Sequence, residues 1–130
     1  MKKFVWILVL EILVVIAVTA AFKLIDQRLV AAAVAGTIFV ILGLVIFIMG
    51  LRDASFRRSF TFPVGCLHLF GVALPLMIVR FLNTTVQFSE VRIWGLPGPL
   101  FHQISGGVYW LLMIAAVADA VRNWRQQRTK

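Results

Sequence analysis

The sequence predicts an all-α membrane protein with four transmembrane helices. Of its 130 residues, 62% are apolar and only 14% are charged, and the mean hydropathy is +0.98, which is outside the usual range of soluble domains. Residues 29–50 contain no charge and no proline. At about 1.5 Å per residue, a helix over this run crosses the roughly 30 Å hydrocarbon layer. The stretches between apolar runs are too short for a soluble domain, so we expect one integral membrane domain over residues 1–130.

The first span is expected over residues 4–22, after a pair of lysines. A signal peptide begins in a similar way, but Glu11 lies inside the apolar run, and a charge there is unusual for a signal peptide. The stretch 23–28 leaves room only for a tight connection. The second span, residues 29–50, should therefore return antiparallel to the first.

Small residues recur along one face of the second span. They are Ala32, Gly36, Gly43 and Gly50. In lipid there is no hydrophobic force between helices, so close approach of backbones at small residues holds helices together. We expect this face to pack against another helix.

The third span is expected over residues 63–82. It begins with a proline, which the first helical turn tolerates, and Pro75 should kink it. The preceding stretch, 51–62, mixes arginine with phenylalanine, as is typical of a membrane surface. The arginines expected to contact anionic lipid headgroups are Arg52, Arg57, Arg58, Arg122, Arg125 and Arg128. The net charge of +8 thus indicates a lipid surface, and we expect no nucleic-acid partner.

The longest connection, residues 83–100, separates the third and fourth spans. Within it Phe88, Val91 and Trp94 recur every three residues. This spacing predicts a short helix over 89–94 that lies on the membrane interface and ends at the glycine that follows.

The fourth span is expected over residues 101–121. Polar or small residues recur along it at spacings of three and four, so this face should look inward, away from lipid. They are His102, Ser105, Tyr109, Met113 or Leu112, Ala116 and Asp119. Basic residues indicate the orientation: nine of the Lys and Arg side chains fall on one side of the spans and four on the other. Both termini should therefore be cytoplasmic, in a bacterial cytoplasmic (inner) membrane.

Three ionisable residues lie within spans, where a charge is costly and requires a partner or a function. Glu11 and His68 are at similar depths when each is counted from the cytoplasmic end of its span, and Asp119 is a few ångströms nearer the cytoplasm. We expect a hydrogen bond between Glu11 and His68. This pair could relay protons, or it could simply fix the register of the helices.

A second polar cluster is expected on the outer side. It comprises Arg80, Glu90, Arg92, His102 and Gln103. A surface ion pair of Glu90 with Arg80 or Arg92 is one interpretation. Recognition of an anionic headgroup or of a partner's outer domain is the other.

No sequence motif indicates a metal site, a cofactor or a catalytic centre, so we predict none of these and no enzymatic activity. Cys66 is the only cysteine, and metal-binding or nucleophile motifs are missing from the sequence. His68 and His102 should lie about 20 Å apart along the membrane normal. One haem iron could then not bind both within a monomer.

Three functional hypotheses follow. The first is a non-enzymatic accessory, anchoring or assembly subunit of a larger membrane complex, with other integral membrane subunits or further copies of the chain as partners. The second is a small proton-coupled transporter or lipid carrier that works as a homo-oligomer. The third is an electron-transfer subunit that contacts haem or quinone through His68 or His102.

Overall fold

The computed structural model describes residues 2–129 and confirms the all-α class. Four segments are long and apolar enough to cross a membrane, so the chain is a multi-pass membrane protein. The elements in order are α1 (Lys2–Leu24), α2 (Arg28–Arg52), α3 (Ala54–Arg57), α4 (Thr61–Cys66), the π-helix η1 (Leu67–Ala73), α5 (Leu74–Leu82), β1 (Arg92–Ile93), β2 (Leu96–Pro97) and α6 (Gly98–Arg128). α4, η1 and α5 follow one another without a break and form the third span.

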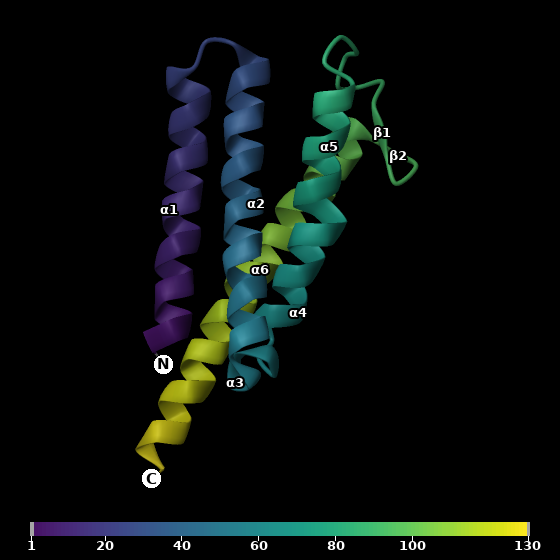
Figure 1. The fold of residues 1–130 in the computed structure, drawn as a ribbon. Helices are drawn as coiled ribbons and strands as arrows, with labels where there is room; N and C mark the ends of the chain where they lie inside the picture. Colours follow the sequence, from purple (N-terminus) through teal and green to yellow (C-terminus); the bar gives the residue numbers. More distant parts are fainter. Residues whose placement is uncertain (1, 130) are drawn as a thin grey trace.

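The four spans form a ring in which each contacts two others. α1 packs against α2 and α6, while the third span packs against α2 and α6. Figure 1 shows α1 and α2 side by side, with α6 crossing behind at a slant. The two ends of the described chain lie at the same end of the bundle as α3 (Figure 1), which we call the terminal end. The connection from α1 to α2 and the β-strands lie toward the other end, the hairpin end.

The core lies where α1, α2 and α6 meet the third span and α3. Its buried apolar residues are Phe4, Ile7, Val14, Leu42, Ile46, Phe56, Tyr109, Leu112 and Ala116. At its terminal end Phe4 stacks on Phe56 with ring centroids 5.4 Å apart. Large apolar side chains such as Trp6, Ile16 and Ile114 point outward. This is the pattern of a bundle surrounded by lipid rather than water.

Glycines of α2 face the third span. A Cβ added to Gly43 would lie 2.8 Å from the Cβ of Leu69, and one added to Gly50 would overlap the ring of Phe62. At Gly36 the space is looser, since a Cβ there would lie 3.7 Å from Met77. Ala32 is only half-buried. The close approach of α2 to the third span thus depends most on Gly43 and Gly50.

The third span departs from α-helical geometry in its middle. η1 ends two residues before Pro75, which lacks the N–H that an α-helix would direct at the carbonyl of Gly71. The indole N–H of Trp94 donates to that carbonyl instead, over 3.1 Å. A side chain of the following segment therefore satisfies a carbonyl that the proline leaves free.

The interfacial helix expected over residues 89–94 is wrong. β1 and β2 form an antiparallel hairpin there, with Ile93 paired to Leu96. Trp94 (φ 53°) and Gly95 (φ 79°) form its turn, and positive φ at both positions is what a type I′ turn requires. Val91 and Ile93 are both buried against Val72 of η1 and Phe101 of α6. Burial at every second residue is typical of a strand. The spacing of three between Phe88, Val91 and Trp94 had indicated a helix instead.

Candidate intramembrane polar site

Two polar side chains lie inside the bundle without a hydrogen-bond partner. Glu11 of α1 is 0% exposed, and His68 of η1 is 2% exposed. Neither carboxyl oxygen of Glu11 nor Nδ1 of His68 has a partner within residues 2–129. Unpaired buried polar atoms are rare because each costs roughly 1–3 kcal/mol. A concentration of three such atoms marks a candidate functional site.

Tyr109 of α6 brings the two groups into one cluster. Its hydroxyl donates to the main-chain carbonyl of Glu11 over 2.6 Å, and its ring centroid lies 5.7 Å from that of His68. Phe39 of α2 closes the cluster, with ring centroids 5.3 Å from Tyr109 and 5.8 Å from His68. All four spans thus contribute one side chain to this polar site, which we define as Glu11, Phe39, His68 and Tyr109.

The hydrogen bond expected between Glu11 and His68 is not formed in the structure. His68 packs its ring against Tyr109 and Phe39 instead. The sequence analysis placed Tyr109 on the polar face of the fourth span but did not join it to the other two. The sequence signal for its place inside the bundle was the recurrence of polar residues along that face.

Asp119 lies apart from the polar site. It is ten residues beyond Tyr109 on α6, which is about 15 Å of helical rise. Its carboxylate accepts from the backbone N–H of Thr61 (2.8 Å) and from the Thr61 hydroxyl (2.7 Å). Both residues are buried. Asp119 therefore holds the start of α4, where a negative charge is favoured by the free N–H groups of the helix.

A surface ion pair ties the first helix to the connection that follows the second. Lys3 pairs with Asp53, whose carboxylate also accepts from the N–H (2.9 Å) and hydroxyl (2.7 Å) of Ser55 and so caps α3. The hydrogen bonds from Lys3 and then Ser55 hold the pKa of Asp53 well below its usual range. The sequence analysis assigned no role to these residues.

Two residues of the expected outer cluster, Arg80 and His102, both lie near the ring of Phe88, and the ion pair considered for Glu90 is not formed among residues 2–129. The guanidinium of Arg80 lies 4.9 Å from the ring centroid of Phe88, and Phe88 lies 6.4 Å from the ring of His102. Arg92 donates to the carbonyl of Gly95 over 3.3 Å. Within the described part of the chain, the only ion pair joins Lys3 to Asp53. The ring of Phe88 thus lies between Arg80 and His102, and it was not part of the cluster expected from the sequence.

The arginines expected at lipid headgroups are all exposed. They are Arg52, Arg57, Arg58, Arg122, Arg125 and Arg128. Two of them lie over aromatic rings: Arg122 is 5.9 Å from the ring of Phe60, and Arg128 is 3.9 Å from that of Trp124. This combination of arginine and aromatic rings is typical of the headgroup layer.

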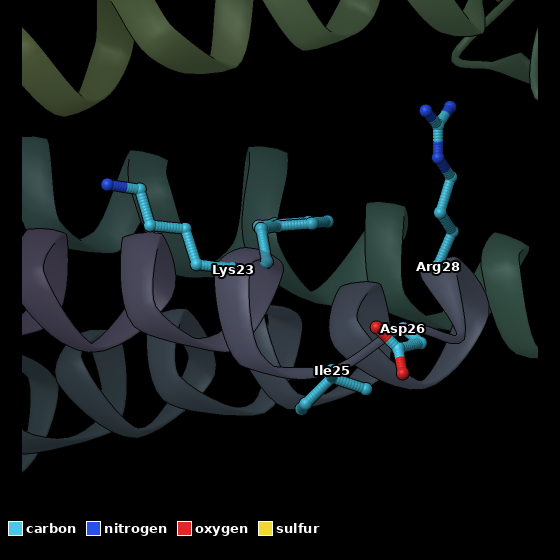
Figure 2. A pocket seen from close by; sticks show the side chains of 5 residues that line it. Lys23, Ile25, Asp26 and Arg28 are labelled. Carbon is cyan, nitrogen blue, oxygen red and sulfur yellow. The ribbon is translucent and has the colours of Figure 1, made fainter.

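A shallow surface hollow lies at the turn from α1 to α2. It is lined by Phe22, Lys23, Ile25, Asp26 and Arg28. Figure 2 shows the side chains of Lys23 and Arg28 extending to the same side, on either side of the turn that carries Asp26. This hollow is remote from the polar site, since Glu11 lies twelve residues before Lys23 on α1. No group of three or more His, Cys, Asp or Glu in residues 2–129 could hold a metal ion.

One side of α6 has no neighbour within the bundle. We define this α6 lateral surface by Gln103, Gly106, Gly107 and Trp110, all of them exposed. A Cβ added to Gly106 or Gly107 would meet nothing within 4 Å, and Trp110 is 65% exposed. Trp110 follows Tyr109 directly and so lies at the depth of the polar site.

No protein-family model matches the chain, and neither a curated protein nor a solved structure matches it.

Proposed function

We propose that the protein is a non-enzymatic accessory, anchoring or assembly subunit of a larger membrane complex. The observation that carries this proposal is the α6 lateral surface, where a glutamine and two adjacent glycines lie on the outside of a membrane-spanning helix. We propose that it binds a transmembrane helix of another subunit.

Two physical arguments support this role for the α6 lateral surface. Gln103 lies near the start of α6, and its exposed amide can hydrogen-bond to a polar group of a neighbouring helix. Adjacent glycines with open space above them let a second backbone approach closely. Trp110 adds a large apolar contact beside them. Together these residues have the composition of a helix-packing surface and not of a surface adapted to lipid.

The proposed orientation has both termini on the cytoplasmic side of a bacterial inner membrane. It rests on the excess of basic residues near the chain ends and the 51–62 connection. This orientation is tested by labelling with a membrane-impermeant maleimide. Single cysteines are introduced at Asp26 or at Gln126 in a Cys66→Ala background. We expect labelling at residue 26 from outside intact cells and labelling at residue 126 only after lysis. The reverse pattern would refute the orientation.

The partner hypothesis is tested by native mass spectrometry of the protein extracted from its own membrane in mild detergent. We expect the chain to travel with larger, different chains. To locate the contact, Gln103→Cys in a Cys66→Ala background is cross-linked in the membrane. The control is Ile16→Cys, which is also exposed but lies on α1. Cross-links to a different chain from residue 103 and none from residue 16 support the proposal; equal yields contradict it.

A second candidate is a proton-coupled transporter or lipid carrier that works as a homo-oligomer. Glu11 and His68 support it, because both are buried in the spans with unpaired polar atoms. Recovery of the chain only as a homo-oligomer would favour this candidate over the accessory subunit. In that case loss of transport in Glu11→Gln, with assembly intact, is the result expected of a coupling residue.

A further inference from the structure

Glu11 has no opposite charge facing it from any element of the bundle. On α1 itself the nearest cation is Lys3, eight residues or about 12 Å away, and its ammonium pairs with Asp53. α2 carries no ionisable residue between Arg28 and Arg52. A counter-charge for Glu11 must therefore come from the third span or from α6.

The third span and α6 provide no cation at this depth. Between Arg58 and Arg80 the titratable residues are Cys66 and His68, and His68 has Nδ1 unpaired. On α6 the facing group is Tyr109, whose hydroxyl already donates to the main chain of Glu11. Asp119 is about 15 Å further along α6, is itself acidic, and pairs with Thr61. Among residues 2–129, these elements therefore offer no cation that neutralises a carboxylate at Glu11.

A carboxylate in this position would be both desolvated and unpaired. Burying such an ion without a partner is far more costly than burying a neutral acid, and a proton removes the charge. We infer that the polar site is a proton-binding site, in which Glu11 holds a proton in its carboxyl group at neutral pH.

The chemistry of the site favours a proton over a metal cation. A metal ion would require several oxygen or nitrogen ligands, whereas the site offers one carboxyl and one imidazole nitrogen among aromatic rings. The inference does not depend on which partner the α6 lateral surface binds.

The chain composition allows a direct test, because its two glutamates are Glu11 and Glu90. In the Glu90→Gln variant, Glu11 is the only glutamate. The full chain is synthesised with glutamate labelled with ¹³C at its side-chain carboxyl and reconstituted into vesicles. Its infrared spectrum is recorded at neutral pH. We expect the carbonyl stretch of a protonated acid to shift with the label and again in D₂O. A labelled carboxylate band alone would overturn the inference.

Two variants test whether the labelled band belongs to Glu11. Glu11→Gln should remove the protonated-acid band, and the labelled Glu90→Gln spectrum keeps the test decisive should Glu11→Gln fail to fold. Asp119→Asn, which changes an acid outside the polar site, should leave the labelled band in place.

Discussion

The carboxylate of Asp119 on α6 accepts two hydrogen bonds from Thr61, one from its backbone N–H and one from its hydroxyl. These residues are 58 positions apart in the chain, and both are buried. The contact fixes where the third span begins relative to the fourth. It also accounts for an acid that the sequence analysis grouped with Glu11 and His68.

Asp119→Ala should destabilise the bundle by roughly 2–3 kcal/mol, because it leaves a buried N–H and a buried hydroxyl of Thr61 without an acceptor. The measurement is thermal unfolding of the purified protein in detergent. Asp26→Ala is the matched control, since Asp26 is exposed in the connection from α1 to α2. Equal unfolding temperatures for the two variants would show that the contact contributes nothing to stability.

The sequence predicted the spans well because their signal is local. A long uncharged run is visible in the sequence itself. In a membrane such a run forms a helix, because the helix satisfies its own backbone hydrogen bonds. The hairpin of β1 and β2 was missed for the opposite reason. Its stability depends on burying Val91 and Ile93 against Val72 and Phe101, which belong to other elements, η1 and α6.

The polar residues were found from the sequence, but their partners were not. Depth along a helix follows from counting residues, so Glu11 and His68 could be expected at a common level. The rotation of each helix about its axis cannot be obtained by counting residues. This rotation is what brings His68 against the rings of Phe39 and Tyr109. The partner of Asp119 includes a main-chain N–H, which is free only because α4 begins at Thr61.

Gly43→Ala should destabilise the bundle by roughly 1–3 kcal/mol, since the added Cβ would lie 2.8 Å from the Cβ of Leu69 and overpack the contact between α2 and η1. Gly106→Ala is the matched control, because a Cβ there meets nothing within 4 Å and alanine is the better helix former. Its unfolding temperature should be unchanged or higher. A larger loss at Gly106 than at Gly43 would contradict the packing described for α2.

Gly107→Leu should separate stability from assembly. The side chain has open space in the isolated chain, so the unfolding temperature of the purified protein should hardly change. In the native membrane the same side chain should block the close approach of a partner helix. We therefore expect reduced recovery of the complex by native mass spectrometry. Normal recovery of partner chains with Gly107→Leu would place the contact outside the α6 lateral surface.

The ion pair of Lys3 with Asp53 should make stability depend on acid and salt. The pKa of Asp53 is lowered in the folded protein, so the carboxylate stabilises the fold above the unfolded-state value of about 3.9 and loses this effect as the pH falls further. Because the pair is on the surface, salt should weaken it. The unfolding temperatures of wild type and Asp53→Asn should therefore differ at neutral pH and low salt, and converge in acid or in high salt. A difference that persists in both conditions would exclude this pair as its cause.

Trp94 and Pro75 should show coupled effects on stability, because the proline withholds the N–H that the carbonyl of Gly71 would otherwise accept and the Trp94 indole replaces it. Trp94→Phe alone should cost about 1 kcal/mol through the lost hydrogen bond. In a Pro75→Ala background the alanine N–H can reach the Gly71 carbonyl, so Trp94→Phe should cost less. A double-mutant cycle of unfolding free energies in detergent measures this coupling. Additive effects of the two substitutions would mean that the indole does not compensate for the proline.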